Sequence, residues 1–194
     1  MDNEIIQIDM RGNRMLEKNY LKSIEKDIKK EYEEASDLLD VGKFEEARGK
    51  FNDILDKIED FIPALNKIAV IEIYNNNLEK AEEILTKILE EDPDYVPALT
   101  NLGSIEKKKG NLDKAEKLYE KAIEIEPEYG NAYNNLGVIY REKGKYTKSV
   151  RYLKKARKRG SYSFKFDDEP LYKNKGCLFF VGVIVIVVLY FILF

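Results

Sequence analysis

A period of 34 residues is the feature of this 194-residue sequence that most constrains its fold. Residues of similar kind recur at this spacing in five separate registers. The registers are Gly42, Asn76, Gly110 and Gly144; Ala35, Ala69, Gly103 and Gly137; Ala47, Ala81, Ala115 and Ser149; Phe44, Leu78, Leu112 and Tyr146; and Phe61, Tyr95 and Tyr129. A repeat of this length is one supersecondary unit that buries its apolar face against its neighbours, so the sequence predicts a solenoid.

Within each repeat the sequence has the pattern of two helices joined by a tight turn. In the last repeat, Leu136, Gly137 and Tyr140 follow Tyr133 at the i, i+3, i+4, i+7 spacing of a helix with one buried face. Gly144 comes where the chain has to turn. Because Gly and Asn tolerate the left-handed conformation that ends many helices, we expect helix ends at Gly144 and at its equivalents in the other repeats.

The residues before the first helix of each repeat are also distinctive. Phe61, Tyr95 and Tyr129 could form an aromatic ladder for a ligand, but packing as hydrophobic staples is the favoured interpretation. Pro63 and Pro97 fall at the starts of first helices, where the missing N–H costs nothing.

This pattern resembles the tetratricopeptide repeat, a 34-residue helix–turn–helix unit with small residues at matching places. The matching segments are 63–93, 97–127 and 131–156. The unit at 28–61 is degenerate, since Glu31 and Glu34 occupy positions that are usually apolar. The resemblance covers residues 28–160 and implies an all-α solenoid of helical hairpins with about four repeats. It indicates the fold specifically and says little about the partner.

The last residues form an apolar segment. From Cys177 to Phe194 every residue except Gly182 is apolar. As a helix, these residues would rise about 27 Å, close to the hydrocarbon thickness of a bilayer. A buried core element is the alternative, but an uncharged apolar run of this length favours one C-terminal transmembrane helix over 176–194. A juxtamembrane linker over 161–175 would lead to it.

Charge predicts the orientation of this segment. Residues 154–175 hold eight basic and three acidic side chains, and no charged residue follows the apolar segment. We therefore expect a single-pass membrane protein with its N-terminal domain in the cytosol and its C-terminus on the far side. Cys177 at the cytosolic edge is a candidate for acylation, with a small apolar residue as the favoured alternative.

A basic cluster lies before the linker, in an otherwise acidic body. It is assigned to the membrane surface in preference to nucleic acid, because residues 1–153 carry a net negative charge. The cluster consists of Lys154, Lys155, Arg157, Lys158 and Arg159.

In the tetratricopeptide family, peptide ligands bind a concave groove lined by the first helices. Helical phase predicts Val70, Ile73 and Val138 as exposed apolar groove residues, with ordinary packing as the alternative. Lys107 and Arg141 would make the C-terminal half of the groove positive. The predicted protein-binding residues are Asn66, Val70, Ile73, Thr100, Ser104, Lys107, Asn134, Val138 and Arg141.

The two ends of the repeat array differ. Leu16, Tyr20 and Ile24 step by four, which predicts one long helix over 14–41 whose first part covers the first repeat. After Arg159 no capping helix is indicated, so the last repeat can meet a partner, another copy or the bilayer. The predicted segments are 1–27, with the leading helix; 28–160, the solenoid with units 28–61, 62–95, 96–129 and 130–160; the linker 161–175; and the membrane helix 176–194.

Composition argues against an enzyme. The sequence has no His and one Cys, which excludes imidazole-based nucleophilic catalysis and a Cys/His zinc site. No cofactor is expected. The predicted function is a membrane-tethered scaffold that binds partner proteins or peptides through its groove. The alternative is a structural assembly factor of a membrane complex, acting through self-association as a homo-oligomer or through the uncapped last repeat.

Overall fold

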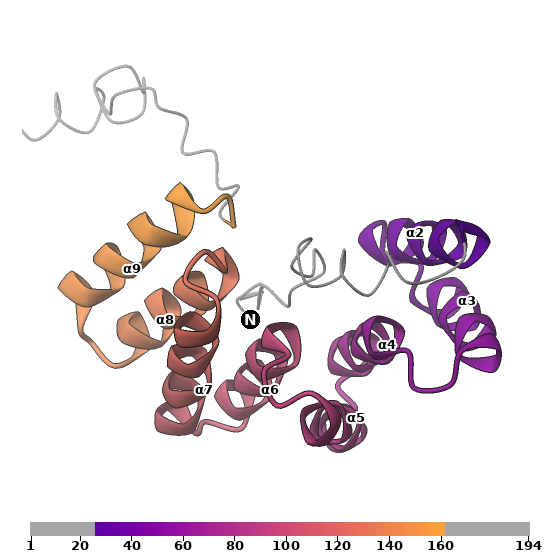
Figure 1. Cartoon of the computed structure of the whole chain (residues 1–194). Coiled ribbons are helices and arrows are strands. Elements are labelled where there is room, and N and C mark those ends of the chain that lie inside the picture. Colours follow the sequence, from indigo (N-terminus) through magenta and orange to yellow (C-terminus); the bar gives the residue numbers. More distant parts are fainter. Residues whose placement is uncertain (1–25, 162–194) are drawn as a thin grey trace, which may run out of the picture. The chain divides into compact units, whose positions relative to one another are not determined.

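The computed structural model describes residues 26–161, which form eight α-helices and no strand within that range (Figure 1). The helices pair into four hairpins in chain order. They are α2 (Lys26–Asp40) with α3 (Phe44–Lys57), α4 (Ile62–Tyr74) with α5 (Leu78–Glu91), α6 (Val96–Lys108) with α7 (Leu112–Ile125), and α8 (Gly130–Glu142) with α9 (Tyr146–Lys158). The prediction of an all-α solenoid of helical hairpins is confirmed.

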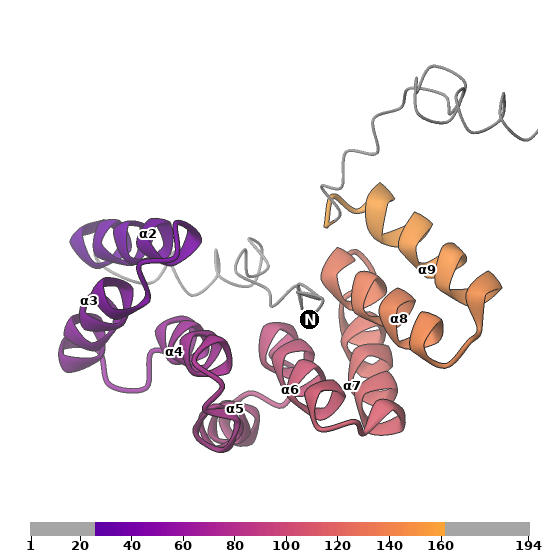
Figure 2. The ribbon, with the colours of Figure 1, turned by 180° about the vertical axis from the view of Figure 1, so that it is seen from behind.

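Each hairpin packs against the next, and the helices separate into two layers. The first helices α2, α4, α6 and α8 contact one another in succession. Figures 1 and 2 show these four helices, called here the first-helix layer, on the inner side of the row, with α3, α5, α7 and α9 outside them. The first-helix layer is therefore the surface on which the predicted binding residues have to be placed.

The turns inside the hairpins follow the 34-residue period. Gly42, Asn76, Gly110 and Gly144 have φ angles of 79°, 62°, 83° and 69°. This left-handed conformation is strained for most L-residues and open to Gly and, at lower cost than for other side chains, to Asn. The turn prediction is confirmed at all four positions, and it explains why one register of the repeat is restricted to these two residue types.

The loops between hairpins are anchored by the aromatic register. Phe61, Tyr95 and Tyr129 are the N-cap residues of α4, α6 and α8, and all three are buried. Pro63 and Pro97 occupy the first turns of α4 and α6, as predicted. Buried rings at these three positions favour packing over a solvent-facing ladder.

Close approach within hairpins depends on glycine. A Cβ at Gly103 would lie 2.6 Å from the Tyr119 ring, and one at Gly137 would lie 2.7 Å from the Leu153 side chain. At both positions the glycine makes room for a large side chain of the second helix.

Several predictions fall outside the described residues. No helix within 26–161 is long and apolar enough to cross a membrane. The predicted membrane helix 176–194, Cys177, the linker beyond Ser161 and the leading residues 14–25 all lie outside that range.

Candidate functional site

The nine predicted binding residues all lie on α4, α6 and α8 of the first-helix layer, but most of them are not accessible. Lys107 and Val138 are half-buried and Arg141 is exposed, so the open part of the layer is the C-terminal half of α6 and α8. The buried members are Asn66, Val70, Ile73, Thr100, Ser104 and Asn134.

The expectation that Val70 and Ile73 are exposed groove residues is wrong. Both side chains have 0% exposure and belong to the apolar core that runs through the first two hairpins. Nearly every residue of α4 from Ile62 to Ile73 is buried, which is why helical phase alone misplaced these two. Of the three predicted apolar groove residues, only Val138 keeps partial exposure.

The positive charge predicted at Lys107 is neutralised. Its Nζ lies 2.9 Å from Glu142 Oε1, on the next first helix, and the Lys107 side chain is only 13% exposed. Sequence spacing did not reveal this pair, because Lys107 and Glu142 are brought together only by the packing of α6 beside α8. Arg141 is thus the exposed cation of the predicted pair.

A row of buried asparagines crosses the first-helix layer. Asn101 Nδ2 donates to Asn66 Oδ1 at 3.0 Å, so α6 is joined to α4. The remaining amide atoms, Asn66 Nδ2, Asn101 Oδ1 and Asn135 Nδ2, have no hydrogen-bond partner. Buried polar atoms are nearly always paired, so these three, called here the amide row, need an explanation. Asn101 and Asn135 stand 34 residues apart, a signal in the sequence that the groove prediction did not use.

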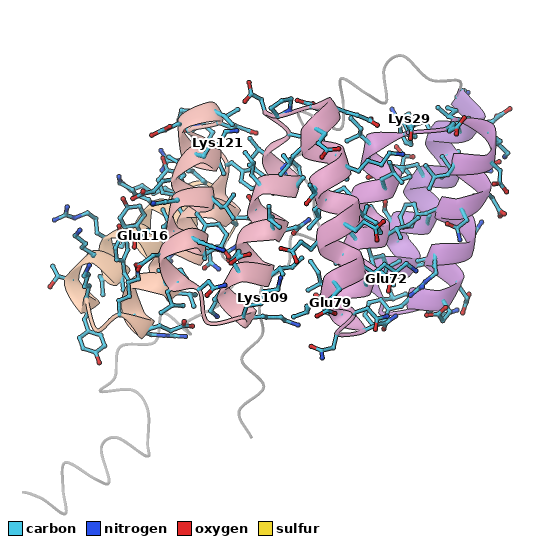
Figure 3. The ribbon with its side chains drawn as sticks, turned by 90° about the horizontal axis from the view of Figure 1, so that it is seen from below. Lys29, Glu72, Glu79, Lys109, Glu116 and Lys121 are labelled. Carbon is cyan, nitrogen blue, oxygen red and sulfur yellow. The ribbon has the colours of Figure 1, made fainter. Side chains whose placement is uncertain are left out.

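A second polar arrangement holds the hairpins together at one edge. Glu72, at the end of α4 and fully buried, accepts hydrogen bonds from Asn77 Nδ2 at 2.9 Å and from Arg48 Nη1 at 2.9 Å, and Lys80 Nζ lies 2.8 Å away. Glu106 repeats the contact, accepting from the amide of the next turn. Figure 3 places Glu72, Glu79 and Lys109 along one edge of the stack, with Lys29 and Lys121 along the opposite edge.

The electrostatics of Glu72 favour its charged form. Burial raises the pKa of Glu72, but hydrogen bonds from Lys80 and Asn77 and the charges of Arg48 and Lys80 outweigh it, so the pKa lies below the usual value. The carboxylate therefore has a structural role, tying the end of α4 to α3 and to the start of α5. Within 26–161 no group of acidic or sulfur ligands could hold a metal ion.

The basic cluster on α9 is partly used for packing. Lys155 and Arg159 lie over the Tyr133 ring, at 5.6 and 4.4 Å from its centroid. Arg159 also donates to the Pro127 carbonyl at 2.7 Å and pairs with Glu128 at 3.1 Å. Two of the five predicted membrane-surface cations thus hold α9 against α8 and the loop before it. The Lys154, Arg157 and Lys158 side chains are exposed.

The arrangement defines a class of protein: a helical-hairpin repeat solenoid with its polar binding candidates on the inner layer. Two family models of the tetratricopeptide repeat match the sequence, one over residues 62–95 and the other over 94–160, together just over half of the chain. Residues 62–160 of the chain are therefore tetratricopeptide repeats. No curated protein matches the sequence significantly.

Solved structures share this fold. A crystal structure of MamA is 24% identical, with a TM-score of 0.53, and the match covers 74% of this chain and 84% of that one. A thermophilic tetratricopeptide protein of Thermus thermophilus, TTC0263, is 20% identical, with a TM-score of 0.60 and coverages of 66% and 72%. MamA of Desulfovibrio magneticus RS-1 is 17% identical, with a TM-score of 0.53 and coverages of 70% and 76%. These likenesses establish the fold, which is typical of protein–protein interaction.

Proposed function

We propose that this protein is a membrane-tethered scaffold that binds an extended segment of a partner protein along its first-helix layer. The observation that carries the proposal is the open part of the first-helix layer, where Val138 is half-buried and Arg141 is exposed on α8. The amide row itself is buried, with Asn66 and Asn101 at 0% exposure, and it joins α4 to α6 within the layer.

The open end of the layer indicates what such a segment would carry. Val138 is half-buried and Arg141 is exposed, one helical turn apart on α8. An apolar side chain followed by an acidic one would complement this pair. The proposal therefore keeps Val138 and Arg141 from the sequence prediction as direct contacts and drops Val70 and Ile73, which are buried.

Photo-crosslinking in the protein's own membrane tests ligand binding. A benzoylphenylalanine in place of Val138 is expected to capture a discrete partner protein, and the adduct should weaken about tenfold when Arg141→Glu reverses the exposed charge. The matched control carries the same probe in place of Lys117, which is exposed on the outer helix α7. Equal adducts at both positions, or no adduct at position 138, would contradict groove binding.

The membrane tether rests on the apolar segment 176–194 and on the basic residues that precede it. We expect the full chain to remain in the membrane pellet after an alkaline carbonate wash, since about 18 apolar residues are enough to span the hydrocarbon core. Protease added outside sealed cells should leave the repeats intact. Release by carbonate, or digestion of the repeats from outside, would contradict the tether or its orientation.

One observation favours the alternative, an assembly factor that self-associates. Tyr146 and Val150 on α9 are 68% and 52% exposed, an unusual state for large apolar side chains that lie side by side. Homo-oligomerisation through the last repeat is the second candidate function.

A further inference from the structure

Apolar exposure within 26–161 is concentrated at the two ends of the solenoid. Besides Tyr146 and Val150 on the last helix, the strongly exposed large apolar residue is Val41, directly after the first described helix, with 71% exposure. Tyr74, at 36%, stacks on Phe44. The ends of a solenoid are where surfaces that pack between repeats elsewhere are left uncovered.

Val150 belongs to a series whose other members join one hairpin to the next. The series, at the 34-residue period, is Arg48, Glu82, Glu116 and Val150. Arg48 binds Glu72 at 2.9 Å, Glu82 binds Lys109, and Glu116 accepts from Tyr140 at 2.7 Å and pairs with Lys143. In each case the partner lies at the end of the following first helix. Val150 is therefore the position that would meet a fifth first helix.

The positions that would meet Val150 are found at the other end of the same chain. Leu38 occupies the position equivalent to Glu72, Glu106 and Tyr140, one 34-residue period earlier in the chain. Val41 likewise occupies the position equivalent to Asn75, Lys109 and Lys143. Leu38 is half-buried and Val41 is exposed. Inside the solenoid, the contact at these positions between the second helix of one hairpin and the following first helix is polar at every junction. At the two ends, the residues in the same positions are Val150, Leu38 and Val41, and all three are apolar. The two ends are therefore complementary in their apolar character, and neither end resembles an internal junction.

Charge on the terminal helices is complementary as well. Helix α9 has six basic side chains and no acidic one, whereas α2 has six acidic and three basic ones. Opposite potentials on two surfaces speed their association and disfavour the pairing of either surface with itself. Two α9 helices would repel each other, and so would two α2 helices, but α2 and α9 attract.

We propose that a second copy of this chain covers α9, with α2 of one copy docked on α9 of the next as α8 docks on α7. The contact is heterologous, because the two surfaces differ, and it therefore allows the solenoid to continue from chain to chain. It specifies how the self-association named as the second candidate function would occur. It is independent of ligand binding at Val138 and Arg141 and of the membrane tether.

Charge variants of the full-length chain in mild detergent test the register of this contact by sedimentation velocity. Val150→Glu and Val41→Lys are each expected to weaken the concentration-dependent association of the parent about tenfold or more, since each buries an unpaired charge. The double variant should recover it, because its two charges repeat the Glu116–Lys143 pair. Both positions are exposed, so neither change disturbs the core.

Mixing and control variants complete the test. An equimolar mixture of the two single variants should recover assemblies like those of the parent. The changed end of each variant pairs with the changed end of the other, and their unchanged ends pair as in the parent, so the two variants can alternate. Arg151→Gln and Asn52→Lys alter exposed positions by the same charges and should associate like the parent. A monomeric parent, loss of association with Val150→Glu but not with Val41→Lys, or no recovery in the double variant would each overturn the proposal. The second result would mean that α9 packs against α9 of another copy, against lipid or against detergent, and not against α2.

Discussion

Replacing Glu72 by leucine is expected to lower the free energy of unfolding by about 3 kcal/mol, because the change removes one partner of a buried ion pair. Arg48, whose side chain is 22% exposed, loses its 2.9 Å partner, and Asn77 loses the acceptor that holds the turn after α4. Urea unfolding followed by circular dichroism at 222 nm measures the loss. Glu79→Leu is the control, since Glu79 is exposed on the next helix and should change stability by less than about 0.5 kcal/mol.

The same carboxylate gives a signed pH dependence. Because the pKa of Glu72 in the folded chain lies below its ordinary value of 4.5, its contribution is complete above about pH 4.5. The contribution is lost as the pH falls through the lower, folded-state pKa. The stability difference between the parent and Glu72→Leu should therefore be constant near neutral pH and shrink at acid pH. A difference that grows on acidification would contradict the assignment of Glu72 as a stabilising anion.

Gly103→Ala is the second change with a large expected effect, a loss of about 1–3 kcal/mol from overpacking. The new Cβ would lie 2.6 Å from the Tyr119 ring, which is fully buried and held between hairpins, so that α6 and α7 must move apart. Thermal unfolding of the variant should show a clearly lower midpoint with unchanged helix content at low temperature.

Gly49→Ala provides a control of opposite sign. Gly49 lies inside α3, and nothing would be within 4 Å of its Cβ. Alanine loses less backbone entropy than glycine when a helix forms, so this variant should be more stable by about 0.5–1 kcal/mol. If both variants shift in the same direction, the distinction between a packing glycine and a solvent-facing glycine is wrong.

The candidate site was only partly predictable. The first helices and their order followed from periodicity, and the half-buried Val138 and exposed Arg141 lie where helical phase put them. Val70 and Ile73 were misplaced, since phase identifies a face of a helix but not how many neighbours cover that face. The partner of Lys107 was missed because Glu142 is 35 residues away in the chain.

The sequence by itself determined the hairpin, its length and its turns. These depend on local physics: a left-handed residue at Gly42, Asn76, Gly110 and Gly144 ends each first helix whatever surrounds it. Only the tertiary structure decided which polar groups are paired across helices and which glycine faces a ring. It also decided that Val150 and Val41 are exposed, at positions whose equivalents in the other repeats are polar. Those outcomes depend on the distance between neighbouring helices and on the rotation of each helix about its axis. The contacting residues are 24 to 35 positions apart in the chain, so no local sequence pattern reports this packing.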